Sequence, residues 1–253
     1  MKKIVFLLAI SFAFISCNSD DDSTPVNVDL VLNFTQNWDG TNVRSSDIDN
    51  TVYTNEMGHE LKIARLRYLV SNITLTHSDG TVYNASDYNL IDLSDSTSLT
   101  YDTGMQIPEG AYTVSFVHGF NEADNIDAEY NDLNTAGWNW PTMLGGGYHF
   151  LQFDGMYNVN TVTPMPFNFH NGTARVSTDV FEQNFVNITL QNTINISATS
   201  VVDIQMNISE WFKNPNTWDL EVYDTPLMPN YTAQKLMQEN AATVYSADTI
   251  LIP

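Results

Sequence analysis

Alternation of apolar and polar residues with a period of two constrains the fold of this chain more than any other feature. It starts at Val26, where apolar side chains at positions 26, 28, 30, 32 and 34 point one way, with polar residues at 27, 29, 33 and 35 between them. The longest such segment runs from Glu60 to His77. This period is typical of half-buried strands, whose successive side chains point to opposite faces of a sheet. Further strands are expected at 82–83, 89–93, 112–118, 148–153, 167–170, 185–190 and 201–208.

Turn sequences separate these segments, and helical periodicity is confined to 231–242. Ser78-Asp79-Gly80 and Pro108-Glu109-Gly110 have the composition of tight turns between strands. Many short strands with a single late helix predict an all-β fold, an antiparallel β-sandwich that is immunoglobulin-like or jelly-roll-like. We expect long loops, the longest over 121–147, and a short C-terminal helix.

The first 16 residues have the composition of a lipoprotein signal peptide. Lys2 and Lys3 precede an apolar run over 4–15 that is too short to span a bilayer. The run leads into Ser16-Cys17, which is like a bacterial lipobox, and Cys17 is the only cysteine, so it cannot form an internal disulfide. We predict a lipid anchor at Cys17 and an outer membrane lipoprotein that faces the cell surface or the periplasm.

From length and composition, we expect residues 17–25 to form an acidic tether behind the anchor and residues 26–253 to form a single domain. The aspartates at 20–22 fit two interpretations, a surface-export signal or a solvated spacer. The chain holds 9 Lys and Arg against 30 Asp and Glu. Cleavage before Cys17 removes two lysines and leaves 7 − 30 = −23, which argues against nucleic acid and anionic lipid as partners.

Three of the five histidines fall at predicted strand ends. His118 closes one strand, His149 opens the next, and His170 closes the one after that. If these strands run up, down and up, the three imidazoles share one edge of the sandwich and form a metal site of the kind that copper prefers. The alternation argues in part against this shared site. It places His149 on the same strand face as the apolar Leu151, but His170 on the face opposite to the apolar Phe169. A structural role for each histidine stays open.

The stretch 137–155 surrounds these histidines with Trp138, Trp140 and a glycine triplet at 145–147. The tryptophans fit two interpretations, a plug at the end of the core or part of a binding site. The acidic stretch 121–127 offers oxygen ligands for calcium, without EF-hand spacing. No nucleophile elbow, zincin helix or haem motif is present, so we do not expect an enzyme.

Taken together, these pieces resemble the MbnP-like copper-binding protein family, a group of exported β-sandwich proteins. The resemblance covers most of the mature domain, and the order and spacing of its motifs are more specific than any one of them. The motifs are Leu32-Asn33-Phe34 with Trp38-Asp39-Gly40, the segment 67–75 before Asp79-Gly80, Pro108 to Tyr112, Phe116 to Asn121, Trp138-Asn139-Trp140, Gly147 to Phe150, Asp154-Gly155, and Phe169-His170-Asn171-Gly172.

This resemblance implies copper binding by histidines and, in some relatives, a tryptophan oxidised to kynurenine at the copper site. It also implies a di-haem peroxidase-like protein as the oxidising partner. On this sequence His170 is the histidine of the Phe-His-x-Gly motif, and Trp138 or Trp140 is the candidate for oxidation. The chain departs from the family pattern at Gln36, where relatives often place a histidine.

Two functions follow as hypotheses. The first is a lipid-anchored extracytoplasmic copper-binding protein that holds the ion with His149, His170 and His118 and an oxidised tryptophan. The alternative is a cell-surface module that binds a glycan or other organic ligand by stacking on Trp138 and Trp140.

Overall fold

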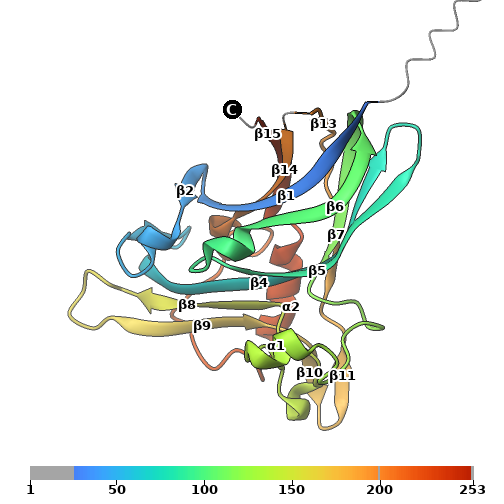
Figure 1. Ribbon diagram of the computed structural model, residues 1–253. Helices are drawn as coiled ribbons and strands as arrows, with labels where there is room; N and C mark the ends of the chain where they lie inside the picture. Colours follow the sequence, from blue (N-terminus) through green and yellow to red (C-terminus); the bar gives the residue numbers. More distant parts are fainter. Residues whose placement is uncertain (1–25, 199, 252–253) are drawn as a thin grey trace, which may run out of the picture.

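Two large β-sheets pack on each other in the computed structural model, which describes residues 26–198 and 200–251 (Figure 1). The sandwich confirms the all-β prediction. The signal peptide over 1–16, lipidation at Cys17 and the tether over 17–25 lie outside the described residues. Short 3₁₀ helices connect some of the strands, namely η1 (Ser45–Asp47), η2 (Ser96–Leu99), η3 (Thr142–Leu144) and η4 (Ile208–Phe212).

The first sheet is built on β1 (Asn27–Trp38), whose inward side chains alternate as the sequence predicts and are almost fully buried. One edge of β1 pairs with β14 (Ser200–Asn207), which pairs in turn with β15 (Tyr245–Leu251). Its other edge pairs with β6 (Thr100–Pro108) and β2 (Thr41–Val43). The β1–β14 pair is parallel, a departure from the predicted antiparallel pattern, while the other pairs in this sheet are antiparallel.

The second sheet is built on β4 (Glu60–His77), the strand with the longest predicted run. β3 (Tyr53–Thr54) and β5 (Val82–Asp92) pair with one edge of β4. Along the other edge, β7 (Gly110–His118) pairs with 70–77 and β8 (Leu151–Tyr157) with 61–68. β7 and β8 are both antiparallel to β4, so they run in the same direction and meet end to end. β9 (Met165–Asn171) pairs with β8, and β12 (Val186–Thr189) and β13 (Ile194–Ile196) pair with β7.

Between β7 and β8 the chain leaves the sheet to form a lobe over 119–150. Both ends of this lobe are hydrogen-bonded to Leu69 of β4. The N–H of Gly119 donates to the carbonyl of Leu69, and the N–H of Leu69 donates to the carbonyl of Phe150. The lobe contains α1 (Asn131–Thr135) and lies beside the hairpin of β10 (Ala174–Ser177) and β11 (Val180–Glu182) (Figure 1). It has its own apolar cluster, made of Leu69, Phe120, Leu133, Trp138, Tyr148 and Phe150.

The segment from η4 to α2 (Tyr231–Ala241) covers the inner face of β8 and β9. Phe169 and Trp218 have ring centroids 4.3 Å apart, and Phe153 and Phe212 lie at 5.6 Å. The helix begins after Asn230, whose side chain accepts the N–H of Ala233, and its bounds confirm the predicted C-terminal helix. Since the apolar residues of β8 and β9 face this covering, the intervening polar residues point to the opposite face of the sheet. Among the described residues, no helix combines the length and apolar character that crossing a bilayer requires.

Candidate metal centre

His149 and His170 lie side by side where the lobe returns to the sheet. His149 lies two residues before the start of β8, and His170 is the penultimate residue of β9. Their ring centroids are 5.3 Å apart and the rings are nearly perpendicular, at 80°. The structure therefore brings together two of the three histidines that the sequence predicts.

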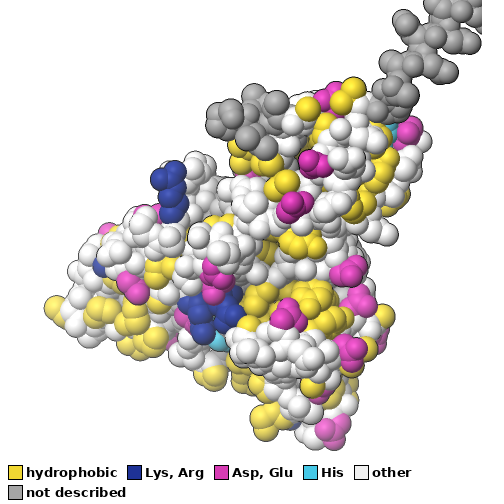
Figure 2. Space-filling model, in the orientation of Figure 1, with side chains coloured by type: hydrophobic (Ala, Val, Ile, Leu, Met, Phe, Trp, Pro, Cys, Tyr) yellow, Lys and Arg dark blue, Asp and Glu magenta, His cyan; other side chains and the backbone are white. Residues whose placement is uncertain are grey.

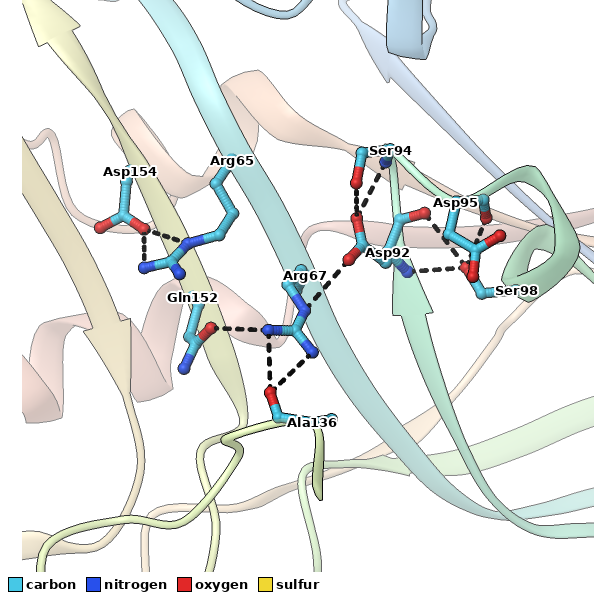
Figure 3. A network of polar contacts seen from close by, with 9 residues as sticks. All are labelled: Arg65, Arg67, Asp92, Ser94, Asp95, Ser98, Ala136, Gln152 and Asp154. Carbon is cyan, nitrogen blue, oxygen red and sulfur yellow. Dashed lines mark hydrogen bonds and ion pairs between the residues drawn. The ribbon is translucent and has the colours of Figure 1, made fainter. Parts of the chain in front are cut away.

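The ring of His170 is oriented by Asp154 on the neighbouring strand. Its Nε2 lies 2.8 Å from Asp154 Oδ1. The other oxygen of Asp154 accepts Arg65 Nε at 2.5 Å, as Figure 3 shows. Burial alone raises the pKa of Asp154, but bonds from His170 and Asn168 and the charges of His170 and Arg65 lower it to about 2. An ionised carboxylate can only accept, so Nε2 of His170 carries a hydrogen, and the form of the ring that binds a metal would do so through Nδ1.

The ring of His149 is oriented by the backbone of the lobe. Its main-chain N–H and its Nδ1 both contact the carbonyl of Trp138, at 2.9 and 3.1 Å. A carbonyl only accepts, so Nδ1 carries the hydrogen and Nε2 keeps a lone pair. Burial, followed by the charges of His170 and Arg65, lowers the pKa of His149 to about 3. The ring is therefore neutral at neutral pH.

These two rings fit a metal such as copper. Metal-binding histidines usually donate the nitrogen that does not bind the ion to a carboxylate or a backbone carbonyl, and here Asp154 and Trp138 take those roles. With metal–nitrogen bonds of about 2 Å, two imidazoles on one ion at a tetrahedral angle have centroids about 5 Å apart. The observed spacing of 5.3 Å agrees with this. Imidazole ligands suit copper, zinc and iron.

Both predicted tryptophans border this pair, but neither reaches the surface. Trp138 is 0% and Trp140 1% exposed, with centroids 5.5 and 4.9 Å from that of His149. The prediction that they form a stacking platform for a glycan is wrong, because their faces are covered by the lobe and by neighbouring side chains. Gly172 leaves room for Trp140, since a Cβ at that position would lie 2.6 Å from the indole ring.

A positively charged group lies over Trp138. The guanidinium carbon of Arg67 is 5.0 Å from the centre of its ring. Arg67 also donates to Ala136 O at 3.3 Å and to Gln152 at 3.4 Å, and its Nε lies 3.2 Å from Asp92 (Figure 3). This arginine thus joins β4 and β8 to the lobe. In Figure 2 basic side chains gather on this face beside a histidine, with hydrophobic and acidic side chains nearby.

The structure does not bring His118 to the pair. It continues the buried face of β7 and is 0% exposed, with Nδ1 2.8 Å from Tyr245 Oη and the Trp211 ring 5.4 Å away. Burial lowers its pKa to about 3, against a smaller opposing effect of Asn171. The expectation of a three-histidine edge is wrong for two reasons. β7 and β8 are not an up-and-down pair, and His118 points into the core.

Gln36 lies in the same interior as His118. It is 3% exposed and donates to Tyr68 Oη at 2.8 Å, and the Tyr68 ring is 6.3 Å from that of Tyr245. This departure from the family pattern therefore concerns the core between the sheets. It leaves the two imidazoles beside the lobe unchanged.

Side chains of the acidic stretch 121–127 hold the glycine triplet in place. Asp127 accepts the N–H of Gly147, and Asn125 accepts that of Tyr148 at 2.9 Å. Gly147 has a φ of +79°, and a Cβ there would overlap the Asn125 side chain. Among the residues that the structure describes, no three histidine or carboxylate ligands converge in this stretch. The composition that indicated calcium is explained by these contacts.

One potential ligand group was missed in the sequence. His59, Asp219 and Glu221 have ligand atoms within 4.8 Å of one another. No sequence signal links them, because they are 160 residues apart and His59 has the appearance of a surface histidine. The Asn55 amide nitrogen lies 3.5 Å from His59 Nδ1, and the group is rich in oxygen ligands, which suit harder ions than copper.

Comparison with known proteins decides the family. A model of the MbnP family matches residues 27–231, which is most of the chain. This chain belongs to the MbnP family. The solved structure of MbnP from Methylosinus trichosporium is similar to the fold, with a TM-score of 0.56 at 12% identity, over 88% of this chain and 99% of that chain. At that identity the likeness shows the fold alone. The search of curated proteins finds no match.

Membership of the MbnP family confirms the resemblance read from the sequence and supports a copper-related role. The family match spans the lobe and both imidazoles, from β1 to the first residue of α2. The histidine pair is therefore part of the domain that defines the family.

Proposed function

We propose that this MbnP family member binds copper between His149 and His170. The observation that carries this proposal is the arrangement of the two rings, each with one nitrogen held by Asp154 or by the Trp138 carbonyl and the other left with a lone pair. Outer contacts of this kind fix both ring orientation and tautomer before the ion arrives. Preorganisation of the ligands lowers the cost of binding.

The surroundings favour an ion that accepts few, neutral nitrogen ligands. His149 is 6% exposed and packs against both tryptophan rings, so little water reaches its ring. The nearest carboxylate, Asp154, is already bound to His170 and Arg65. Hard ions such as calcium need several oxygen ligands, whereas copper is satisfied by imidazoles.

Of the two tryptophans, Trp140 is the better candidate for oxidation to kynurenine. Oxidation that begins with loss of an electron leaves a positive charge on the indole, and the Arg67 guanidinium 5.0 Å from Trp138 opposes such a charge. Trp140 has no cation–π partner among the described residues, and its ring is closer to His149. Oxidation there would add polar groups beside the two imidazoles. Both indoles are buried, so the oxidant is expected to act through a docked partner, a di-haem peroxidase-like protein.

The anchor and the location belong to the same proposal. The lipobox-like Ser16-Cys17 supports lipidation and an outer membrane lipoprotein, and the acidic 17–25 segment would separate the anchor from the domain. We regard the protein as a copper-binding protein rather than an enzyme.

The test is copper binding to the purified domain and to a His149→Ala/His170→Ala double variant. We expect wild type to bind a single copper ion and the double variant to lose at least about 100-fold in affinity. His77→Ala is the matched control, since His77 pairs with Asp79 far along β4 and should leave affinity unchanged. Equal copper uptake by wild type and the double variant would disprove the proposal.

A further inference from the structure

A groove opens directly beside His170. It lies between the turn around η3 and the loop 225–229, has a volume of about 450 Å³, and has His170 and Asn168 among its lining residues. The backbone N–H of Asn168 donates to Asp224 O at 3.0 Å, which fastens the loop to β9. The groove therefore gives access to His170, one of the two histidines of the candidate metal centre.

Two methionines supply the only sulfur atoms in the groove. Met143 belongs to the η3 wall and Met228 to the facing loop, and both line the groove with His170. Met143 is 76% exposed, an unusual position for a large apolar side chain. Prolines flank both positions, Pro141 before Met143 and Pro229 after Met228, so stiff walls carry flexible thioether side chains.

The groove holds no carboxylate and no permanent cation. His170 is its only ionisable lining residue, although the chain as a whole is strongly acidic. Oxygen ligands that would attract calcium or magnesium are thus limited to amide, hydroxyl and carbonyl groups. The soft, uncharged thioether is instead a ligand for Cu(I), whereas Cu(II) prefers nitrogen and oxygen ligands.

We propose that Met143 and Met228 bind Cu(I) in this groove and deliver it to His170. The inference rests on the proposed function and adds the oxidation state of the ion and its route. Neutral sulfur and nitrogen ligands along the route keep the ion in the reduced state, so delivery requires no electron transfer. Nδ1 of His170, free of Asp154, is the nitrogen that receives the ion.

The test compares a Met143→Leu/Met228→Leu variant with wild type. Leucine keeps the volume and apolar character of the groove and removes only the sulfur. Met156→Leu/Met165→Leu is the matched control, because these methionines are 36% and 43% exposed at the far ends of β8 and β9. Cu(I) affinity is measured by competition with a Cu(I) chelator, Cu(II) affinity by direct titration, and the ligands by copper X-ray absorption.

We expect the groove variant to lose at least about tenfold in Cu(I) affinity or in the rate of Cu(I) uptake. Its Cu(II) affinity and that of the control should stay within about twofold of wild type, and the sulfur signal of Cu(I)-loaded wild type should disappear. The proposal is overturned if the groove variant takes up Cu(I) like wild type and no sulfur signal is present in either.

The two proposals fail in distinguishable ways. If His149→Ala/His170→Ala abolishes Cu(I) binding while the methionine variant is unaffected, the groove assignment fails and the histidine site stands. If the methionine variant loses Cu(I) while the histidine variant keeps it, the groove binds copper and the histidine site fails. Wild type that binds Cu(II) but no Cu(I) overturns the groove proposal alone, and wild type that binds neither ion contradicts both.

Discussion

Replacing Asp154 with Asn changes the atom of His170 that carries the hydrogen without changing the size of the neighbouring group. In wild type, the ionised carboxylate accepts Nε2–H at 2.8 Å and leaves the Nδ1 lone pair free. An asparagine amide can donate to Nε2, and the hydrogen then moves to Nδ1. The lone pair that faces the ion is lost in that tautomer.

The expected cost follows from the role of Asp154 as the outer contact of a ligand. Loss of such contacts typically weakens metal binding by about 10–100-fold, which is about 1.4–2.7 kcal/mol. The effect on folding should be smaller. The Arg65 side chain that pairs with Asp154 is 44% exposed, so its lost ion pair is worth less than about 1 kcal/mol.

The assay is copper titration with thermal unfolding measured on the same samples. Asp92→Asn is the control, since Asp92 also pairs with an arginine of β4, Arg67, but contacts neither histidine. We expect Asp154→Asn to lose copper affinity while remaining folded, and Asp92→Asn to keep affinity within about threefold. Equal affinity in Asp154→Asn and wild type, or an equal loss in both variants, would refute the orienting role of Asp154.

Three further predictions concern pH, packing and modification. The depressed pKa of His118, about 3, means that the unfolded chain binds more protons below pH about 6.5. Its contribution to stability is therefore complete above that pH and falls by up to about 1.4 kcal/mol per pH unit towards pH 3, and His118→Gln should flatten this fall in denaturant titrations. Gly172→Ala should lower the free energy of unfolding by about 1–3 kcal/mol, because the methyl group meets the buried Trp140 ring, and an unchanged melting temperature would contradict the packing described. Peptide mass spectrometry of natively expressed protein should find kynurenine at Trp140, and kynurenine confined to Trp138 would contradict the role given to Arg67.

The strands could be predicted because their alternation is local. β4 matches the expected 60–77 segment at both ends, and α2 differs from the expected helix by a single residue. Pairing could not be predicted, because alternation gives the buried face of a strand and not its neighbour. The parallel β1–β14 pair joins segments about 170 residues apart, and β7 and β8 share one edge of β4.

The candidate site was predicted only in part, because the alternation of buried and exposed residues holds within a strand and not beyond its ends. His118 lies on the same buried face of β7 as Phe116, so the alternation in the sequence was sufficient to predict that His118 is buried. His149 precedes β8, and the parity of the strand does not extend into the lobe, where the Trp138 carbonyl orients the ring. Asp154 belongs to the Asp154-Gly155 motif, but neither its contact with His170 nor that with Arg65 could be predicted, since both depend on the register of β4, β8 and β9.

The most direct measurement is the anomalous difference map from a crystal of the copper-loaded protein, with data collected above and below the copper edge. We expect the strongest peak between the rings of His149 and His170, within about 2 Å of one nitrogen of each. A strongest peak beside His59, Asp219 and Glu221, with none at the histidine pair, would contradict it.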